Sequence, residues 1–484
     1  MNSRFRTTVM LLLAIANGSS YAQAETYYVT QSSRASDDNN GSSRRPWRTI
    51  SAAAQRAQAG DTVFVAAGDY RDEDTGWGLG VIPLLNSGTQ SQPIRFRTNW
   101  GARPLVSRMF LKDCSHVIVE GFHFSGACFE EMPGWTDMPT IVRDTVAPER
   151  PDYEQPWENR QEQVEAEFAT YFGLIHLLEY RSAIDVENGV GIKLTNNIID
   201  GYWAGIQCRH CERVTIACNR ISHSVNGIFT WQSPALVDSE ISFNTITHSL
   251  DNGIDIREGS QNVRVDQNYV SLSGRSHIAL LNGVSDSRVR NNVVTYGGYY
   301  SESMEYPGSS AINIHSSLSG NVVQGNLAAY QVDLTEVDGN GIILDLMRDG
   351  ASVTVRNNIL WRNMGDGLNT TISPNAVIKS NSFIENGYGA QGYRRGAGIK
   401  LARNEDLQQT ILNNTFLFNR AAGIMSYHII DQQKDINRNQ YITLFAPMIW
   451  DGYSEDDRAY HTLRAIRSRT PWERNGWGIS LYWW

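Results

Sequence analysis

Short segments of alternating aliphatic and polar residues recur along the middle of this chain, and a glycine opens most of them. The glycine–aliphatic step stands at Gly205-Ile206, Gly227-Ile228, Gly253-Ile254, Gly341-Ile342, Gly367-Leu368, Gly398-Ile399 and Gly423-Ile424, with His277-Ile278 and Ala311-Ile312 as degenerate copies. Successive copies are 22, 26, 24, 34, 30, 26, 31 and 25 residues apart. A repeat of this size is typical of one turn of a parallel β-solenoid.

Within each copy the alternation has a period of two, which predicts a strand with one buried face. Ile254 and Ile256 should therefore point into the solenoid, while Asp255 and Arg257 point outward. Because copies stack about 4.8 Å apart, equivalent outward positions should form straight ladders. The first predicted ladder is Gln207, Phe229, Asp255, Ala279, Asn313, Ile343, Asn369, Lys400 and Met425, and the second includes Arg209, Trp231, Arg257, Leu281, His315 and Asp345.

The repeats set the predicted domain boundaries. Residues 25–430 should form the solenoid, with a capping helix over Ser51–Ala59 at its start and a cap or tail over 431–484, including a helix near Glu455–Arg467. Residues 130–181 interrupt the rhythm with twelve Asp or Glu against four Arg and a helical pattern near its end. This insertion is either a solvated surface segment or a flap over a groove.

Residues 1–24 have the pattern of an export signal. Two arginines precede a short apolar stretch, and Ala22-Gln23-Ala24 forms a small-residue cleavage site. The apolar stretch is too short to cross a bilayer, and no later segment has the length and hydropathy for it. We therefore predict a secreted or periplasmic protein without an integral membrane segment. Export permits disulfides, but the five cysteines leave at least one without a partner in the chain.

Composition and charge narrow the partners. The chain is 41% apolar and 19% charged, as in folded soluble proteins, and its formal net charge is −9. Without a basic surplus there is little to displace counterions from nucleic acid, so nucleic acid is not expected as a partner. We also expect a monomer.

Polar residues gather in the copy around Gly253. Asp251, Asn252 and Asp255 offer the hard oxygen ligands that calcium prefers, and Arg257 follows directly. Such a cation would acidify the proton beside a sugar carboxylate and neutralise the developing enolate. The alternative is structural, since Asp251 could cap the turn through its own backbone.

Two motifs carry a resemblance to a known family. Tyr27-Tyr28-Val29, Pro46-Trp47-Arg48-Thr49-Ile50 and Gly60-Asp61-Thr62-Val63 form an entrance block, and Asp251-Asn252-Gly253-Ile254-Asp255 is similar to a D-D-G-W-D calcium motif. The chain thereby resembles secreted right-handed parallel β-helix polysaccharide lyases, above all the ninth polysaccharide lyase family, which includes pectate lyases. The resemblance implies an all-β, single-stranded right-handed parallel β-helix, a calcium cofactor and β-elimination on an acidic, uronic-acid-containing polysaccharide.

The catalytic base of such a lyase is open between several residues. Lys400 lies in a strand like the one that carries the family's catalytic lysine, but five copies from Asp255, or roughly 24 Å. His277 and His315 are nearer and suit proton abstraction near neutral pH. Arg257 could instead bind a uronate carboxylate through two hydrogen bonds.

Other residues are predicted to bind substrate, namely Trp231, Asn313, Asp345 and Tyr299. Two further activities fit the same fold. A glycoside hydrolase needs two carboxylates about 5 to 9.5 Å apart, for which Asp345 and Asp366 in adjacent copies are candidates. A C5-epimerase begins with the same proton abstraction as a lyase. A non-catalytic carbohydrate-binding protein would need only a groove with aromatic walls.

Overall fold

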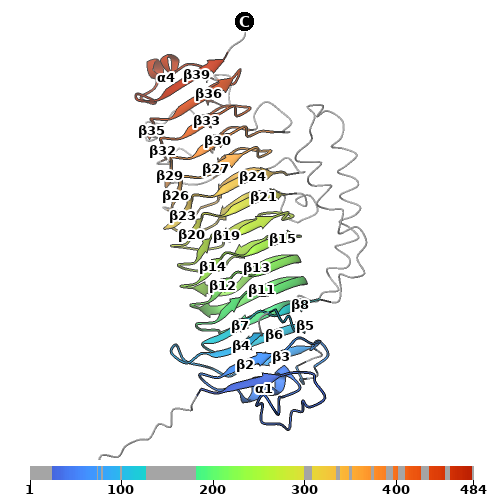
Figure 1. Cartoon of the computed structure of the whole chain (residues 1–484). Coiled ribbons are helices and arrows are strands. Elements are labelled where there is room, and N and C mark those ends of the chain that lie inside the picture. The colour runs from blue at the N-terminus through green and yellow to red at the C-terminus, as the bar shows by residue number, and fades with distance from the viewer. Residues whose placement is uncertain are drawn as a thin grey trace, which may run out of the picture.

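The computed structural model describes residues 24–481, apart from 74, 78–79, 99–100, 127–180, 299–307, 334–337, 348–350, 372–374, 389–395, 402–408, 427–434 and 453–457. Its strands stack rung upon rung along one axis, from β1 (Thr26–Val29) at one end to β39 (Trp477–Leu481) at the other (Figure 1). Every pairing between neighbouring rungs is parallel except the one between β37 (Ile449–Asp451) and β38 (Arg458–Tyr460). The described part of the chain is therefore a parallel β-helix, as the repeat predicts.

Each turn of the helix contributes strands to three faces. The first face is a sheet of β1, β2 (Thr62–Val65), β4 (Ile94–Thr98), β7 (Val117–Glu120), β10 (Lys193–Thr195), β12 (Thr215–Ala217), β14 (Glu240–Ser242), β17 (Arg264–Asp266), β20 (Arg288–Arg290), β23 (Asn321–Gln324), β26 (Ser352–Arg356), β29 (Asn375–Lys379), β32 (Thr410–Leu412) and β35 (Asp435–Asn437). The second face contains β5 (Leu105–Val106), β8 (His123–Ser125), β15 (Thr245–Ser249), β18 (Tyr269–Ser271), β21 (Val293–Gly297), β24 (Leu327–Gln331), β27 (Ile359–Trp361), β30 (Ser382–Ile384), β33 (Thr415–Leu417), β36 (Gln440–Leu444) and β39.

The third face carries the glycine–aliphatic steps and is called the ladder sheet below. It contains β3 (Val81–Leu84), β6 (Arg108–Lys112), β9 (Ser182–Glu187), β16 (Ile254–Ile256), β19 (Ile278–Leu281), β22 (Ser310–His315), β25 (Asn340–Asp345), β28 (Leu368–Thr370), β31 (Ile399–Leu401), β34 (Ile424–Ser426) and β37. Two long strands, β11 (Ile198–Glu212) and β13 (Arg220–Val237), run through both the second face and the ladder sheet.

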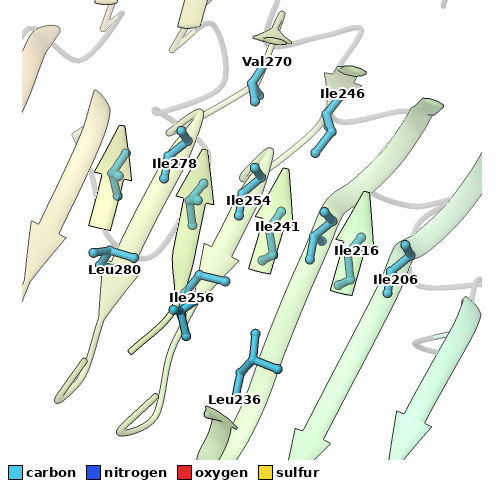
Figure 2. Close-up of a cluster of buried hydrophobic side chains, with 14 of the residues drawn as sticks. Ile206, Ile216, Leu236, Ile241, Ile246, Ile254, Ile256, Val270, Ile278 and Leu280 are labelled. Carbon is cyan, nitrogen blue, oxygen red and sulfur yellow. The ribbon is translucent and has the colours of Figure 1, made fainter. Parts of the chain in front are cut away.

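The core is a column of aliphatic side chains that occupy equivalent positions on successive rungs. Ile206, Ile228, Ile254, Ile278, Ile312, Ile342, Leu368, Ile399 and Ile424 pair in this order and are fully buried. Figure 2 shows Ile206, Ile254 and Ile278 stacked in this way beside Ile246 and Val270 of the neighbouring face. The core therefore extends along the whole stack, built from contacts between apolar side chains at equivalent positions of successive rungs.

The glycine before each buried aliphatic residue is required by close stacking. A Cβ on Gly227 would stand 2.5 Å from the carbonyl oxygen of Gly253, and one on Gly367 would stand 2.7 Å from that of Gly398. Real Cβ atoms do not approach backbone oxygens so closely. The repeat therefore marks the place where successive turns of backbone come nearest.

A column of buried asparagines joins the turns between the first and second faces. Asn197, Asn219, Asn244, Asn268, Asn292, Asn326, Asn358, Asn381, Asn414 and Asn439 follow one another rung by rung. Each Nδ2 group except the last donates to the Oδ1 atom of the next asparagine, and that Oδ1 also accepts from the backbone N–H of the earlier one. The column ends at Glu473, which accepts from Asn439 and from the Tyr441 hydroxyl.

Two helices close the ends. Helix α1 (Ile50–Arg56) begins at Thr49, whose hydroxyl accepts from the Ala52 N–H, and it buries Ala53 against the first rungs. This confirms the predicted capping helix. Helix α4 (Leu463–Arg469) overlaps the predicted second helix but begins eight residues later than expected.

The solenoid extends beyond its predicted C-terminal boundary. The solenoid does not end at residue 430, because β35, β36 and β39 continue its faces with parallel pairing. The repeat pattern missed these rungs because the next ladder strand, β37, has Met448 where earlier copies have the glycine. The insertion at 130–181 and the export signal lie outside the described residues, apart from Ala24 and Arg181.

We expect Asn358→Ala to destabilise the protein by about 3 kcal/mol or more. The substitution leaves the Asn326 N–H groups and the Val323 carbonyl of adjacent rungs without a partner, at about 1–3 kcal/mol each. Urea unfolding followed by circular dichroism measures the change. Asn475→Ala, at an exposed position near the C-terminus, serves as the control and should change stability by less than about 0.5 kcal/mol. Equal effects of the two substitutions would contradict a stabilising role of the column.

Candidate functional site

The outward positions of the ladder sheet form the predicted column. Gln207, Phe229, Asp255, Ala279, Asn313, Ile343, Asn369, Lys400 and Met425 pair in register, one on each successive rung. His315 pairs with Leu281 on one side and Asp345 on the other, so the second ladder is also present there. Counting rungs, Lys400 lies five from Asp255, as predicted.

The cluster around Gly253 is an arginine–carboxylate network. Arg257 donates from Nε to one oxygen of Asp255 at 2.7 Å and from Nη2 to the other at 2.6 Å. Asn252 also donates to this carboxylate at 2.8 Å. Asp255 is wholly buried although its side chain faces away from the core. Burial alone would lower the pKa of Arg257, but the charge of Asp255 raises it above its ordinary value.

These contacts bear on the predicted calcium site. A carboxylate has about four acceptor positions, and protein donors take three of those on Asp255. Asp251 is nearly buried, which raises the pKa of its carboxyl group, and its charged neighbour is Arg275 at 3.5 Å. The donor set as it stands fits an arginine pair and does not fit a cation. Calcium binding at Asp251, Asn252 and Asp255 therefore stays a prediction.

Aromatic side chains flank this network on the preceding rungs. The Arg257 guanidinium lies 5.2 Å from the Phe229 ring centroid, and Trp203 packs edge-on against Phe229 at 5.0 Å. Trp231 on the same rung as Phe229 is 48% exposed. We predicted that Arg257 binds a uronate carboxylate through two hydrogen bonds. The Nε–Nη2 edge of its guanidinium already donates to Asp255, so this edge is not available to a second carboxylate.

His277 does not face the groove, contrary to our expectation. Its side chain is wholly buried, and Nε2 lies 2.9 Å from the Thr295 carbonyl oxygen. Burial lowers its pKa to about 4. A base must come within hydrogen-bond reach of the proton it takes, so a histidine sealed between two faces does not serve as one here.

A second cluster lies nearer the C-terminus and is called the acidic centre below. Asp338, just before β25, is partly exposed and stands near three other carboxylates. Removal from water, and then the charges of Asp333, Asp345 and Asp366, raise the pKa of Asp338 to about 7. A carboxyl group with this pKa is protonated in about half of the molecules at neutral pH, and in that form it can donate the proton.

Lys400 belongs to this centre. Its Nζ atom is 3.8 Å from Asp366 Oδ2, while Asp366 Oδ1 accepts from the backbone N–H groups of Gly396 and Ala397. Two backbone donors and an ammonium group stabilise negative charge on Asp366. The Lys400 ammonium also lowers the pKa of Asp338, though less than the carboxylates raise it.

Asp345 and Asp366, the carboxylates predicted for a hydrolase, do not stand at equivalent positions of their neighbouring strands. Ile343 pairs with Asn369, so Asp345 lies beside position 371, five residues beyond Asp366 along the strand direction, or roughly 16 Å. Asp338 is the group that sequence reasoning missed. In the sequence, Asp338 stands directly before Gly339-Asn340-Gly341, where the chain turns into β25, and this position could have indicated it.

His315 and Asp345 form a hydrogen-bonded pair at the end of the acidic centre. His315 Nδ1 lies 2.9 Å from Asp345 Oδ2, and both side chains keep solvent access. Asn313, beside them on the ladder, has a buried Oδ1 atom with no hydrogen-bond partner among the described residues. Of the predicted site residues, His315, Asp345 and Asn313 thus lie together on adjacent rungs, Lys400 lies three rungs from Asn313 beside Asp366, and Tyr299 lies outside the described residues.

The four cysteines within the described residues take no part in either cluster. Cys114, Cys208, Cys211 and Cys218 are free thiols, and the first three are buried. Across the described ranges, no three or more His, Cys, Asp or Glu side chains come together as a metal site.

Three family models match parts of the chain. The model described as "Periplasmic copper-binding protein (NosD)" matches residues 168–337, "Right handed beta helix region" matches 301–429, and "Protein of unknown function (DUF1565)" matches 34–78. A curated relative, the uncharacterized protein YwoF of Bacillus subtilis (strain 168), is 30% identical over 101 residues, which are 21% of this chain and 20% of the relative. The chain thus matches about a fifth of that relative's length.

Several solved structures are similar in fold at low identity. A mannuronic-acid-specific polysaccharide family 6 lyase from human gut microbiota gives a TM-score of 0.48 at 12% identity, covering 95% of this chain and 91% of its own. Pectate lyase Pel9A gives 0.46 at 13%, covering 86% and 79%. An α-1,3-glucanase of Streptomyces thermodiastaticus strain HF3-3 gives 0.43 at 12%, covering 89% and 65%. At these values none of them assigns an activity to this chain.

The fold itself is settled by the paired strands together with the family model. The chain is a right-handed parallel β-helix, which confirms the fold that its resemblance to polysaccharide lyases implied. No helix among the described residues is long and apolar enough to cross a membrane.

We expect His277→Gln to reduce the acid sensitivity of the fold. The folded-state pKa of about 4 lies below the ordinary 6.5, so the unfolded chain binds a proton first as pH falls. Wild-type stability should drop by about 3 kcal/mol between pH 6.5 and 4 through this residue alone. Urea midpoints across that range measure the drop, which the variant should lack. Exposed His210→Asn is the control and should keep the wild-type slope.

Proposed function

We propose that this protein is a glycoside hydrolase that cleaves a polysaccharide at the acidic centre. The observation that carries the proposal is Asp338, whose pKa of about 7 keeps a proton available beside other carboxylates. Glycoside hydrolysis requires such a pair, one carboxyl group protonated and one ionised. The proposal takes up the hydrolase, which the sequence left as an alternative to the lyase.

Each group has a role in this proposal. Asp338 donates its proton to the glycosidic oxygen as the bond to the anomeric carbon breaks. Asp345, held by His315, removes a proton from the water that attacks that carbon, so one sugar gains a hydroxyl group and the other a free hydroxyl at the leaving oxygen. Asp366 and Lys400 set the local field that separates the protonation states of the pair.

The charge of the centre favours hydrolysis over elimination. Asp333, Asp338, Asp345 and Asp366 face one lysine, in a chain with a formal net charge of −9. A uronate carboxylate would enter an electronegative site there, which costs binding energy. A sugar ring without a carboxylate meets no such repulsion.

β-Elimination is the second candidate because of the His315–Asp345 hydrogen bond. In that reaction His315 takes the proton beside the uronate carboxylate, the glycosidic bond breaks with its oxygen taking a proton from solvent, and a double bond forms in the sugar that lost the proton. Export to the periplasm or medium fits either reaction, since polysaccharides lie outside the cytoplasm, and the periplasmic name of the matched family agrees with it.

A polysaccharide panel separates the two reactions. Alginate, pectate, chondroitin sulfate and xylan are incubated with the protein, and reducing ends and the ultraviolet absorbance of unsaturated uronates are measured. Hydrolysis gives reducing ends without the absorbance, whereas elimination gives both. Cleavage that persists unchanged in Asp338→Asn would overturn the role of Asp338.

We expect Asp338→Asn to lower the hydrolysis rate by about 100-fold or more and to raise stability at alkaline pH. The folded-state pKa lies above the ordinary 3.8, so stability falls as pH rises towards and through 7, and an amide removes that loss. Wild-type activity should likewise decline above pH 7. Rate profiles and melting temperatures at pH 5 and 8 measure both effects. Asp266→Asn, which breaks a pair with Arg290, should keep activity and lose stability.

His315→Gln distinguishes the two candidates. As the base of an elimination, His315 is indispensable, and its loss should abolish the unsaturated product. As the group that orients Asp345, it should lower hydrolysis only about tenfold, because the amide keeps a donor for the carboxylate. Assays of reducing ends and of the absorbance of unsaturated uronates, run on the variant, distinguish the two roles of His315.

A further inference from the structure

Trp231 occupies an unusual place on the ladder sheet. Its side chain is 48% exposed, whereas those of Ile228 and Phe229, which precede it on β13, are buried. Directly after it, strand β13 carries extra residues: Arg209 pairs with Trp231 and Cys211 with Leu236, so one residue of β11 faces four of β13. Such a bulge re-aims side chains and is common beside binding sites.

Arg209, on the rung before Trp231, carries an unsatisfied donor. Its Nη2 atom lies 3.0 Å from both Asp185 and Glu187 on the preceding rung, which fixes the guanidinium, while its backbone pairs with that of Trp231. Its Nε atom is buried without a hydrogen-bond partner among the described residues. Buried polar groups are rarely left unpaired, so this donor points to a bound molecule or water.

The same face leads from Trp231 to the acidic centre. Phe229, Asp255, Ala279, Asn313 and Ile343 stand on consecutive rungs, so Trp231 lies four rungs, or about 19 Å, from Asp345. Phe229, Asp255, Ala279 and Ile343 are themselves buried, whereas the second-ladder residues of the same rungs, Arg257, Leu281, His315 and Asp345, keep solvent access. An extended chain laid along the axis would therefore run over the second ladder from Trp231 to Asp345.

We propose that Trp231 and Arg209 form a distal subsite that binds a sugar ring of a linear polysaccharide. The proposal rests on the proposed function, because the ring belongs to the chain that is cleaved at the acidic centre. The indole face packs against the apolar C–H face of a pyranose, and the arginine donates to its hydroxyl groups. A protein that only cleaved short oligosaccharides would have no use for a site four rungs away.

Binding to the Asp338→Asn variant tests the subsite without turnover. Electrophoretic retardation in gels that contain alginate, pectate, chondroitin sulfate or xylan gives the dissociation constant for each. Trp231→Ala should weaken binding of the retarding polysaccharide about tenfold, the loss expected for one aromatic contact of roughly 1.4 kcal/mol. Trp477→Ala removes an equally exposed tryptophan, on β39 of the second face, and should leave binding unchanged.

The outcomes separate this proposal from the previous one. Equal retardation of the Trp231→Ala and Trp477→Ala variants, or no retardation by any of the four polysaccharides, overturns the distal subsite. Binding that depends on Trp231 in a protein that cleaves none of them keeps the subsite and overturns the hydrolase. In an active enzyme, loss confined to fragments long enough to span four rungs supports both.

Discussion

The hydrogen-bonded column of buried asparagines is the constraint on which this β-helix depends. Each asparagine accepts a backbone N–H from the preceding turn and donates to a carbonyl on the adjacent rung, so it satisfies polar groups that a tight turn would otherwise bury unpaired. The residue before each one adopts a left-handed conformation, as Asn291 and Asn357 do. The column thereby fixes both the corner of every turn and the spacing between turns.

Fixed spacing converts sequence intervals into distances. Residues at one ladder position stand about 4.8 Å apart per rung, whatever the length of the turns between them. Intervals of 22 to 34 residues therefore give the same rise, because the rungs on either side of each interval pair directly. This explains why Asp345 and Lys400, 55 residues apart in sequence, belong to one acidic centre, while Lys400 and Asp255 do not share a site.

The ladder sheet carries two opposite electrostatic arrangements. Around Gly253, each of the two buried aspartates has an arginine beside it, and burial of these charges is compensated by close pairing. At the acidic centre four carboxylates share one lysine, so charge is left under-compensated and the pKa of Asp338 rises. In the proposed hydrolase this electrostatic cost would serve proton transfer, and the paired strands around the centre hold its groups in place.

The sequence by itself determined the fold, the ladder order and the rung count between candidate residues, because a period-two strand with a stacked glycine leaves one arrangement open. It did not determine which outward residues are accessible to solvent and able to exchange a proton or bind a ligand. Burial of His277, the pairing of Arg257 with Asp255 and the approach of Asp338 to Asp366 arise from turns whose paths no local pattern encodes. Proton affinity depends on neighbours in space, so the tertiary structure alone decided where an acid could work.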